Sequence, residues 1–257
     1  MKPSLSVIII TKNSVKTIKK CLDSVRFADE VIILDSGSTD ETVSICQQYT
    51  THVFQTDWPG FGPQKNRALE KATGDWVFSI DSDEWIDDAL REEILHVMQH
   101  STQQVFMMPR LNQYCGQWIY HGDAGKDKVT RLFKRGAAHF SDDKVHERII
   151  TSHPVEKLKS RLHHNTYASL EALISRMNTY STLSAEMRFA RGKKTNLLKA
   201  IISSFWIFTR SYFLRRGFLD GKMGFIVAIH CAESSYYRHI KLMALWQSFR
   251  IRSRESF

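Results

Sequence analysis

The sequence predicts an α/β protein with a mostly parallel central sheet in its first part and a basic helical region at its C-terminus. Two observations lead to this prediction. Apolar runs rich in Val and Ile alternate with segments whose apolar residues recur at helical spacing, which is typical of βαβ units. The last quarter of the chain has helical periodicity and an excess of Lys and Arg. We expect one domain over residues 1–165 and a helical region over residues 166–257.

Strands and helices are expected to alternate along the first hundred residues. Short apolar runs predict strands at 5–10, 30–35, 51–55 and 76–80. Helical spacing and helix-start or helix-stop residues predict helices at 14–25, 38–49, 62–74 and 87–99. Further strands are expected at 104–114, 129–135 and 145–150.

Helical patterns dominate the chain after residue 169. One apolar stripe is expected on the first of these helices, which Gly192 would end: Leu170, Leu173, Ile174, Met177, Tyr180, Leu183 and Met187. The following segment, 197–214, is strongly apolar but carries Lys199 and Arg210. A membrane span needs about 20 largely uncharged residues. An interfacial or core helix is therefore the favoured interpretation of 197–214.

Charge and cysteine content limit the compartment and the partners. The net charge is +9, and residues 188–254 hold fourteen Lys or Arg but only two acids. This basic tail predicts an anionic partner, either nucleic acid or a membrane with acidic lipids. The four cysteines are scattered without a CxxC pair, and the first apolar run is too short for a signal peptide. We expect a cytoplasmic protein with reduced thiols.

Polar residues follow three of the predicted strands. They are Thr11–Asn13, Asp35–Asp40 and Asp81–Asp83. The carboxyl ends of parallel strands line the ligand crevice of an open α/β sheet. We therefore expect these three segments to meet at one site.

Asp81 and Asp83 belong to the stretch WVFSIDSDEWIDD, which has two interpretations. The acids could cap the next helix, or they could hold a hard divalent cation together with phosphate oxygens. Asp87 and Asp88 already stand where a cap is needed, so Asp81 and Asp83 are surplus to capping, although a DxD pattern alone is a weak signal for a cation site.

The loop DSGSTDET at 35–42 also has two interpretations. It could hydrogen-bond a ribose or a base, or it could be a plain turn that starts a helix. It has neither the P-loop spacing nor the GxGxxG pattern of dinucleotide-binding proteins.

Four motifs occur in order over residues 4–85: SVIIITKN, VIILDSGSTDET, GFGPQKNRAL and GDWVFSIDSDEW. Together they resemble the nucleotide-sugar half of the family-two inverting glycosyltransferases, which have the GT-A fold. VTRLFKR and VHERI are similar to a narrower branch, the bacterial lipopolysaccharide core β-1,4-glucosyltransferases that add glucose to the first inner-core heptose. For the helical tail the similarity to that branch is only broad.

The resemblance implies a role for each matching residue. Thr11 and Asn13 would lie beside the uridine, and Asp35 would hold the uracil or the ribose. Lys65 would lie near the base or the diphosphate, and Asp81 would contact the ribose or the sugar.

The resemblance further implies that Asp83 coordinates Mn²⁺ or Mg²⁺ bound to the diphosphate of UDP-glucose. Arg131 would counter the charge of the sugar or diphosphate, with a surface salt bridge as the alternative.

The catalytic base is expected among the carboxylates of SDDKVHERI. An inverting transfer needs one carboxylate to take the proton of the acceptor hydroxyl. We favour Glu147, with Asp143 or Asp142 as alternatives. Glu147 could instead form a surface pair with Arg148 or bind the acceptor. His146 is either an ordinary strand histidine or a neighbour of the metal or diphosphate.

The resemblance makes a membrane-bound lipopolysaccharide acceptor the expected partner of the basic tail, on the inner face of the inner membrane. Aromatic side chains expected to rest in that surface are Phe205, Trp206, Phe208, Tyr212, Phe213 and Phe218. The alternative is a packed helical subdomain with a solvated basic face.

Three other functions compete with this one. The first is a family-two enzyme with a different polysaccharide or glycolipid acceptor. The second is a nucleic-acid-binding protein with an inactive α/β domain, but the tail has no zinc spacing, RNP motif or helix-turn-helix, so no nucleic acid is expected. The third, a sugar nucleotidyltransferase, is disfavoured because TKNSVKT lacks the glycines of a phosphate loop.

Overall fold

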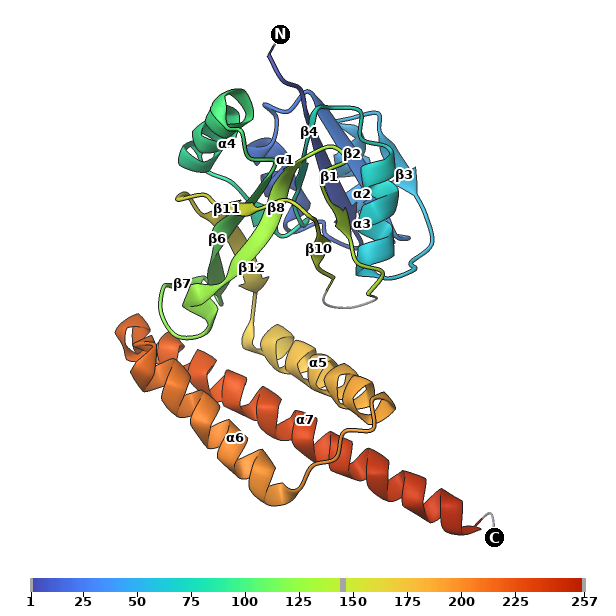
Figure 1. Cartoon of the computed structure of the whole chain (residues 1–257), viewed down its shortest axis with the longest axis vertical. Helices are drawn as coiled ribbons and strands as arrows, with labels where there is room; N and C mark the ends of the chain where they lie inside the picture. Colours follow the sequence, from blue (N-terminus) through green and yellow to red (C-terminus); the bar gives the residue numbers. More distant parts are fainter. Residues whose placement is uncertain (1, 144–146, 256–257) are drawn as a thin grey trace. The chain divides into compact units, whose positions relative to one another are not determined.

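A computed structural model describes residues 2–143 and 147–255 of the chain (Figure 1). The chain forms two compact units. The first comprises Met1–Leu111 and Asp127–Asn165, and the second comprises Asn112–Lys126 and Thr166–Phe257. In the described part of the chain, no helix is both long and apolar enough to cross a bilayer.

Strands and helices alternate through the first unit, as the sequence predicts. The strands, two of which continue into the second unit, are β1 (Leu5–Thr11), β2 (Glu30–Asp35), β3 (Val53–Gln55), β4 (Trp76–Ser79), β5 (Glu84–Trp85), β6 (Val105–Tyr114), β8 (Lys128–Lys134), β9 (His139–Phe140), β10 (Ile149–Ile150), β11 (Val155–Lys157) and β12 (Leu162–Tyr167). The helices are α1 (Ile18–Ser24), α2 (Thr42–Gln47), α3 (Phe61–Glu70) and α4 (Asp88–His100).

The central sheet has the strand order β3-β2-β1-β4-β8-β6-β12-β5. The first four strands are parallel, and Thr11 pairs with Asp35 at the carboxyl end of β1 and β2. β8 lies antiparallel to both β4 and β6. The α/β class and the parallel core of the sheet are thus confirmed, and the antiparallel strands extend that core. Every residue of β1 is buried, because α1 and α3 lie on its two faces (Figure 1).

The first two helices begin later than the sequence predicts. Ile18 starts α1, because the preceding residues form a turn in which Ser14 O accepts from the Ile18 amide at 2.9 Å. Thr42 starts α2, and Asp40 accepts from its amide at 3.0 Å. The polar residues that were predicted to form the first turn of each helix therefore lie in loops that precede and cap the helix. Of the strand predicted at 145–150, only Ile149 and Ile150 form a strand, β10; residues 147 and 148 do not, and residues 145 and 146 lie outside the described part of the chain.

The second unit contains α5 (Leu170–Ala190), α6 (Leu197–Thr209) and α7 (Gly221–Glu255). The π-helical turn η2 (Arg210–Leu214) and the 3₁₀ turn η3 (Gly217–Asp220) connect α6 to α7. The short strand β7 (Gln117–Ile119) and the turn η1 (Ala124–Lys126) also belong to this unit. Helix α7 packs against both α5 and α6, which flank it (Figure 1).

The stripe predicted for α5 is only partly correct. Its buried face is Leu173, Met177, Ser181 and Ala185, an i+4 repeat. Ile174 is 57% exposed, and Leu170 and Met187 are exposed as well. Two small residues continue the buried row because they allow close approach of another helix, which the count of apolar residues could not show.

Candidate active site

A buried lysine brings two of the predicted site carboxylates together. Lys65 lies on α3, and its side chain is only 2% exposed. Its Nζ lies 2.8 Å from Asp81 Oδ1 and 2.7 Å from Glu147 Oε1. Asp81 is the second residue after the end of β4, so this cluster lies at the carboxyl end of a parallel strand. An unpaired ammonium would be costly to bury, and the two carboxylates offset that cost.

A close contact at Gly62 holds the loop that carries Asp143 against α3. A Cβ added at Gly62 would lie 1.8 Å from the backbone oxygen of Ser141. The Gly62 amide donates to the Asp143 carbonyl at 3.3 Å. Only glycine permits this approach. Ser141 and Asp143 therefore lie against α3 at Gly62, about one helical turn before Lys65.

Asp81 also belongs to a network of buried ion pairs. Arg131 donates to Asp81 Oδ2, and it lies 3.0 Å from Glu84 Oε1. The Glu84 side chain is fully buried, accepts from Arg110 at 2.9 Å and accepts from the Asp81 amide at 3.0 Å. Arg110 in turn lies 2.7 Å from Asp127. Arg131 is thus not a surface salt bridge, because its side chain is 6% exposed.

This network holds Asp81 ionised. Burial favours the neutral acid, but Arg131 and Lys65 outweigh it and hold the pKa of Asp81 well below its ordinary value. Burial would also lower the pKa of Arg131, but Asp81 and Glu84 outweigh it and raise that pKa. The same balance raises the pKa of Arg110, chiefly through Glu84 and Asp127. Asp81 is therefore a fixed negative charge rather than a proton acceptor.

Asp83 points to a different partner from Asp81. Its Oδ2 lies 3.6 Å from His164 Nε2, on β12, and its carbonyl accepts from the Asn165 amide. A carboxylate and an imidazole together suit Mn²⁺ or another first-row divalent cation, which phosphate oxygens and water would complete. No group of three or more His, Cys, Asp or Glu side chains is gathered as a metal site in the part of the chain that the structure describes. The residues present fit a cation shared with a diphosphate.

Capping of the next helix does not use Asp81 or Asp83. The N-cap of α4 is Asp87, whose side chain accepts from the Leu90 amide at 2.9 Å. This agrees with the assignment of the capping role to the later acids of the stretch.

Glu147 and Asp143 have different surroundings. Glu147 is 17% exposed and pairs with Lys65, not with Arg148. Asp143 is 42% exposed, accepts from Ser141 Oγ at 2.8 Å and lies 3.7 Å from Arg148. Asp142 is exposed, and His146 lies outside the described residues. Of these carboxylates, Glu147 is the one that the structure joins to Lys65 and Asp81.

The carboxyl ends of β1 and β2 form a second part of the site. Asp35 is fully buried and accepts from the Gly37 and Ser38 amides at 3.0 and 2.8 Å. Asn13 has a left-handed backbone, with φ of 50°, and its side chain accepts from the Thr39 amide at 2.8 Å. Asp35 and Asn13 therefore shape the loop 35–42 in this structure.

Unpaired buried atoms mark the same edge of the sheet. Thr11 Oγ1, Gln64 Oε1 and Arg131 Nε are buried without a hydrogen-bond partner among the described residues. Buried polar atoms are nearly always paired in folded proteins, so each orphan calls for a ligand or a water. Gln64 is held by Ser36 and Thr56, which brings it to the carboxyl ends of β2 and β3.

Comparison with known proteins decides the family. The sequence profile "Glycosyl transferase family 2" matches residues 6–156, which includes every strand-end motif described above. The chain belongs to glycosyl transferase family 2. The predicted GT-A type of α/β fold and glycosyltransferase activity agree with this membership.

Several bacterial relatives extend over nearly the whole chain. A lipopolysaccharide core biosynthesis glycosyltransferase, LpsC of Rhizobium meliloti (strain 1021), is 30% identical over 93% of this chain and 94% of its own length. An uncharacterized glycosyltransferase of Rickettsia prowazekii (strain Madrid E) is 30% identical over 94% of this chain and 87% of its own length.

Two solved structures are similar to this chain at a greater distance. TarS residues 1–349 of S. aureus has a TM-score of 0.46 and 19% identity, over 96% of this chain and 91% of that one. Glucosyl-3-phosphoglycerate synthase of Mycobacterium tuberculosis, solved with Mg²⁺ and UDP, has a TM-score of 0.37 and 26% identity, over 41% of this chain and 43% of that one.

Four residues of the candidate site were not predicted from the sequence: Glu84, Arg110, His164 and Gln64. Glu84 directly follows Asp83 and is the third acid of the stretch WVFSIDSDEWIDD, which could have indicated it. His164 belongs to a strand that pairs with β5, and nothing in its local sequence points toward Asp83. Glu84, Arg110 and His164 lie on the strands β5, β6 and β12, whose register only the fold sets, and Gln64 lies on helix α3.

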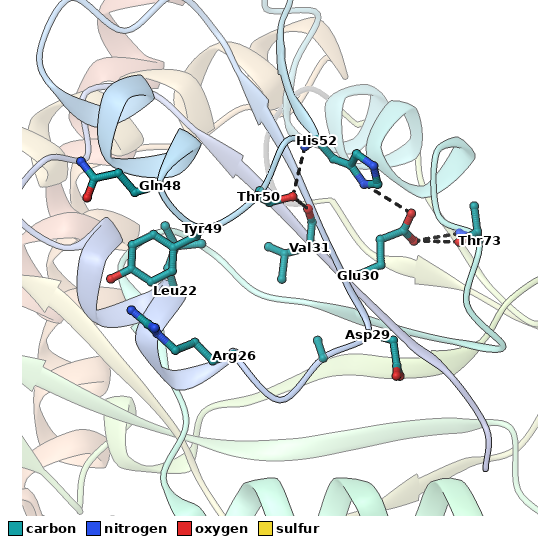
Figure 2. Close-up of a pocket in the computed structure, with 11 residues that line it drawn as sticks. Leu22, Arg26, Asp29, Glu30, Val31, Gln48, Tyr49, Thr50, His52 and Thr73 are labelled. Atoms are coloured by element: carbon teal, nitrogen blue, oxygen red, sulfur yellow. Dashed lines mark hydrogen bonds and ion pairs between the residues drawn. The ribbon is translucent and has the colours of Figure 1, made fainter.

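A separate cavity of about 410 Å³ lies at the other ends of the strands (Figure 2). It is lined by Asp29 and Glu30 at the start of β2, together with His52 and Thr73. Glu30 lies 3.6 Å from His52 and accepts from the Thr73 amide at 3.0 Å (Figure 2). Since Asp35 ends the same strand, this cavity is not part of the predicted site.

Proposed function

We propose that the chain is an inverting transferase that moves a hexose, glucose, from a UDP-sugar to a heptose of the lipopolysaccharide inner core. The observation that carries the proposal is the cluster of Lys65, Asp81 and Glu147 at the carboxyl end of β4, in a chain of a glycosyltransferase family. The 30% identity to a lipopolysaccharide core glycosyltransferase supports the choice of acceptor.

The donor is proposed to bind across the carboxyl ends of β1, β2 and β4. Thr11 and Asn13 would contact the uridine, and the unpaired Thr11 hydroxyl supports that position. Asp35 would shape the loop around the uracil or ribose. Lys65 and Arg131 supply positive charge beside the diphosphate, and Asp81 would orient the sugar or ribose.

A divalent cation, Mn²⁺ or Mg²⁺, is proposed to be held by Asp83, with His164 as a second protein ligand. When bound, it would neutralise the charge that grows on the departing diphosphate. The carboxylate and imidazole of this pair have the donor chemistry for Mn²⁺ in particular.

Glu147 is proposed as the base of the transfer, with Asp143 as the alternative. The acceptor oxygen forms a bond to the anomeric carbon from the side opposite the UDP. Its proton passes to a Glu147 oxygen as the bond between that carbon and the diphosphate oxygen breaks, and the electron pair leaves with UDP. Lys65 positions Glu147 beside Asp81, since both carboxylates contact one ammonium.

The proposal divides the work between the two parts of the chain. Residues 1–165 would form the transferase domain, and residues 166–257 would form a helical region that meets an anionic membrane surface. The protein would then be cytoplasmic and peripheral to the inner face of the inner membrane. The absence of a nucleic-acid-binding motif argues against nucleic acid as the partner of the basic tail.

A UDP-release assay tests this function. Purified protein is given a heptose-containing lipid acceptor and a panel of UDP-sugars, with and without EDTA. We expect UDP-glucose to be turned over fastest and EDTA to abolish turnover. Equal turnover with every UDP-sugar would contradict the donor assignment, and turnover of the panel only with another glycolipid acceptor would favour a different family-two enzyme.

The metal assignment is tested by Asp83→Ala. This variant should lose metal-dependent turnover and Mn²⁺ binding, measured by titration of the ion alone, while its far-UV circular dichroism stays unchanged. Asp88→Ala is the control, because Asp88 is an exposed acid paired with Arg91 on the same helix. Undiminished turnover or Mn²⁺ binding by Asp83→Ala would overturn the assignment.

A further inference from the structure

Helix α6 places its large apolar side chains outward. Leu198, Ile201, Ile202 and Phe205 recur at helical spacing, and their exposed fractions are 65%, 52%, 59% and 71%. Trp206 beside them is 54% exposed. Exposed apolar residues are ordinary when they are scattered, but a continuous stripe of them marks an interaction surface.

The inward face of α6 carries small residues in its first two turns. Ala200 is fully buried, and it is the residue whose carbonyl accepts from Ser204 Oγ at 2.8 Å. Ser203 Oγ lies 3.0 Å from Ser235 Oγ of α7. Small and hydroxyl-bearing residues between helices are typical of packing in membranes, where the surroundings are as apolar as the side chains. Up to Phe205, the large apolar side chains of α6 therefore lie outward and the small ones inward, opposite to a helix that covers a core in water.

The turn after α6 continues this apolar surface. Phe213, Leu214, Phe218 and Leu219 are between 46% and 63% exposed. The ring of Tyr212, half-buried, contacts Phe213 at 5.1 Å and Phe218 at 6.2 Å between centroids. We define the α6 surface as the exposed apolar residues of α6 together with those of this turn.

The rings of Phe208 and Tyr212 lie inside this surface, not on it. They stack at 5.5 Å, and each contacts Phe225 of α7. Both side chains are half-buried and support their neighbours, and the expectation that they rest in a membrane stays a prediction. Phe205, Trp206, Phe213 and Phe218 are exposed as expected.

Exposed cations border the α6 surface. They are Lys199 on α6, Arg216 in the turn and Lys222 at the start of α7. The one acid within residues 193–225 is Asp220, whose side chain is 3% exposed and lies 2.8 Å from His121. Arg215 contributes less than the sequence indicates, because it pairs with Asp123. Within residues 193–225 the border of the surface is thus cationic, with no exposed carboxylate.

We propose that the α6 surface inserts into the headgroup and outer acyl region of a bilayer that contains anionic lipids. Helix α6 has 13 residues, about 20 Å at 1.5 Å per residue, so it lies in the interface rather than across it. Its apolar side chains enter the acyl region, Trp206 lies at the interface, and Lys199, Arg216 and Lys222 contact phosphate groups. A two-fold dimer through the same surface would bring equal charges together, which disfavours a second copy as the occupant.

This inference sharpens the membrane partner of the proposed function, and it does not depend on the donor or the acceptor. It differs from simple attraction of a basic tail, because burial of apolar side chains supplies most of the binding. Binding should therefore persist at about 0.5 M salt, where charge attraction between exposed groups is strongly screened.

Vesicle co-sedimentation with two matched variants tests the inference. Vesicles of phosphatidylethanolamine and phosphatidylglycerol are compared with vesicles of phosphatidylcholine. Ile202→Gln on α6 should weaken binding about tenfold, because one buried aliphatic side chain is lost. Ile174→Gln on α5 is the control, since Ile174 has nearly the same exposed fraction, 57% against 59%.

Two further measurements distinguish a bilayer from a second copy of the chain as the partner of the α6 surface. Trp206 fluorescence should shift to the blue with vesicles, with Trp206→Phe as the reference for the other tryptophans. Sedimentation velocity reports the oligomeric state. The proposal is overturned if Ile202→Gln binds vesicles as the wild type does, or if Ile202→Gln only converts a dimer to a monomer.

Activity on a soluble acceptor separates this inference from the proposed function. Ile202→Gln should keep UDP release with a delipidated heptose acceptor, because Ile202 lies outside the transferase site. Loss of vesicle binding with intact turnover supports the α6 surface. If the wild type binds vesicles but turns over no UDP-sugar, the membrane role of the α6 surface stands and the proposed function is wrong. Loss of turnover by Ile202→Gln on the soluble acceptor would contradict a role confined to the membrane.

Discussion

The two units of the molecule depart from the usual distribution of residues in opposite ways. The first unit buries charge, since Lys65, Glu84 and Arg131 are each between 0% and 6% exposed. The second exposes apolar groups, since Phe205 and Leu198 are 71% and 65% exposed. Buried charge and exposed apolar surface are the two observations that inform most about function. Each is unfavourable in the isolated protein, and each becomes favourable when the right partner binds.

The largest effect is expected from a substitution that removes a charge from the cluster of Lys65, Asp81 and Glu147 and keeps the side-chain volume. Glu147→Gln keeps the shape of the side chain but cannot accept the acceptor proton, so transfer should slow by about 10²–10⁴-fold. Single-turnover kinetics with UDP-glucose and a saturating acceptor measure the loss. Glu156→Gln, an exposed carboxamide substitution in the same domain, should be neutral.

Asp143→Asn discriminates between the two proposed bases. A large loss with Asp143→Asn and a small one with Glu147→Gln would transfer the role of base to Asp143.

The next effect tests whether the buried network holds the first unit together. Glu84→Gln leaves Arg110 and Arg131 with less compensation, and breaking a buried pair typically costs about 3–5 kcal/mol. Urea unfolding of the purified variant measures the change. Asp88→Asn should leave the midpoint where it is, because the Asp88 side chain is 83% exposed. Equal midpoints for Glu84→Gln and the wild type would mean that the network contributes nothing to stability.

A smaller effect appears on acidification. The pKa of Asp81 is lowered in the folded state, so the unfolded chain takes up this proton first as the pH falls. The stabilisation is complete above the unfolded pKa of about 3.9 and is lost as the pH falls below it toward the folded pKa. Unfolding free energies measured from pH 6 to pH 3 should decline less steeply for Asp81→Asn. The same slope in both proteins would show that Asp81 is not the group responsible.

The smallest effect concerns the α6 surface in water. Ile202→Gln should change the free energy of unfolding by at most about 0.5 kcal/mol, because Ile202 makes few core contacts. Leu242→Ala on α7 is the contrast, since Leu242 is 1% exposed and its truncation should cost about 2–5 kcal/mol. Thermal unfolding without lipid measures both. A strongly destabilised Ile202→Gln would mean that α6 covers a core and would weaken the contrast between the units.

Local patterns were sufficient for much of the fold. The parallel strands, their order along the chain and the cap at Asp87 follow from period, burial and spacing, which act over a few residues. Helix starts were predicted too early, because Ser14 and Asp40 satisfy neighbouring amides in loops that resemble first turns. The prediction of the buried stripe on α5 was only partly correct, because burial depends on which face of the helix another helix covers.

The sequence by itself determined the family of this protein and the residues that end its parallel strands. Those features depend on local propensity and on the chain order of the motifs. Only the tertiary structure decided that Lys65 meets Glu147, 82 residues away, and that His164 stands beside Asp83. It also decided that the apolar side of α6 faces outward. Strand register and helix packing choose such partners, and neither is encoded within a few neighbouring residues.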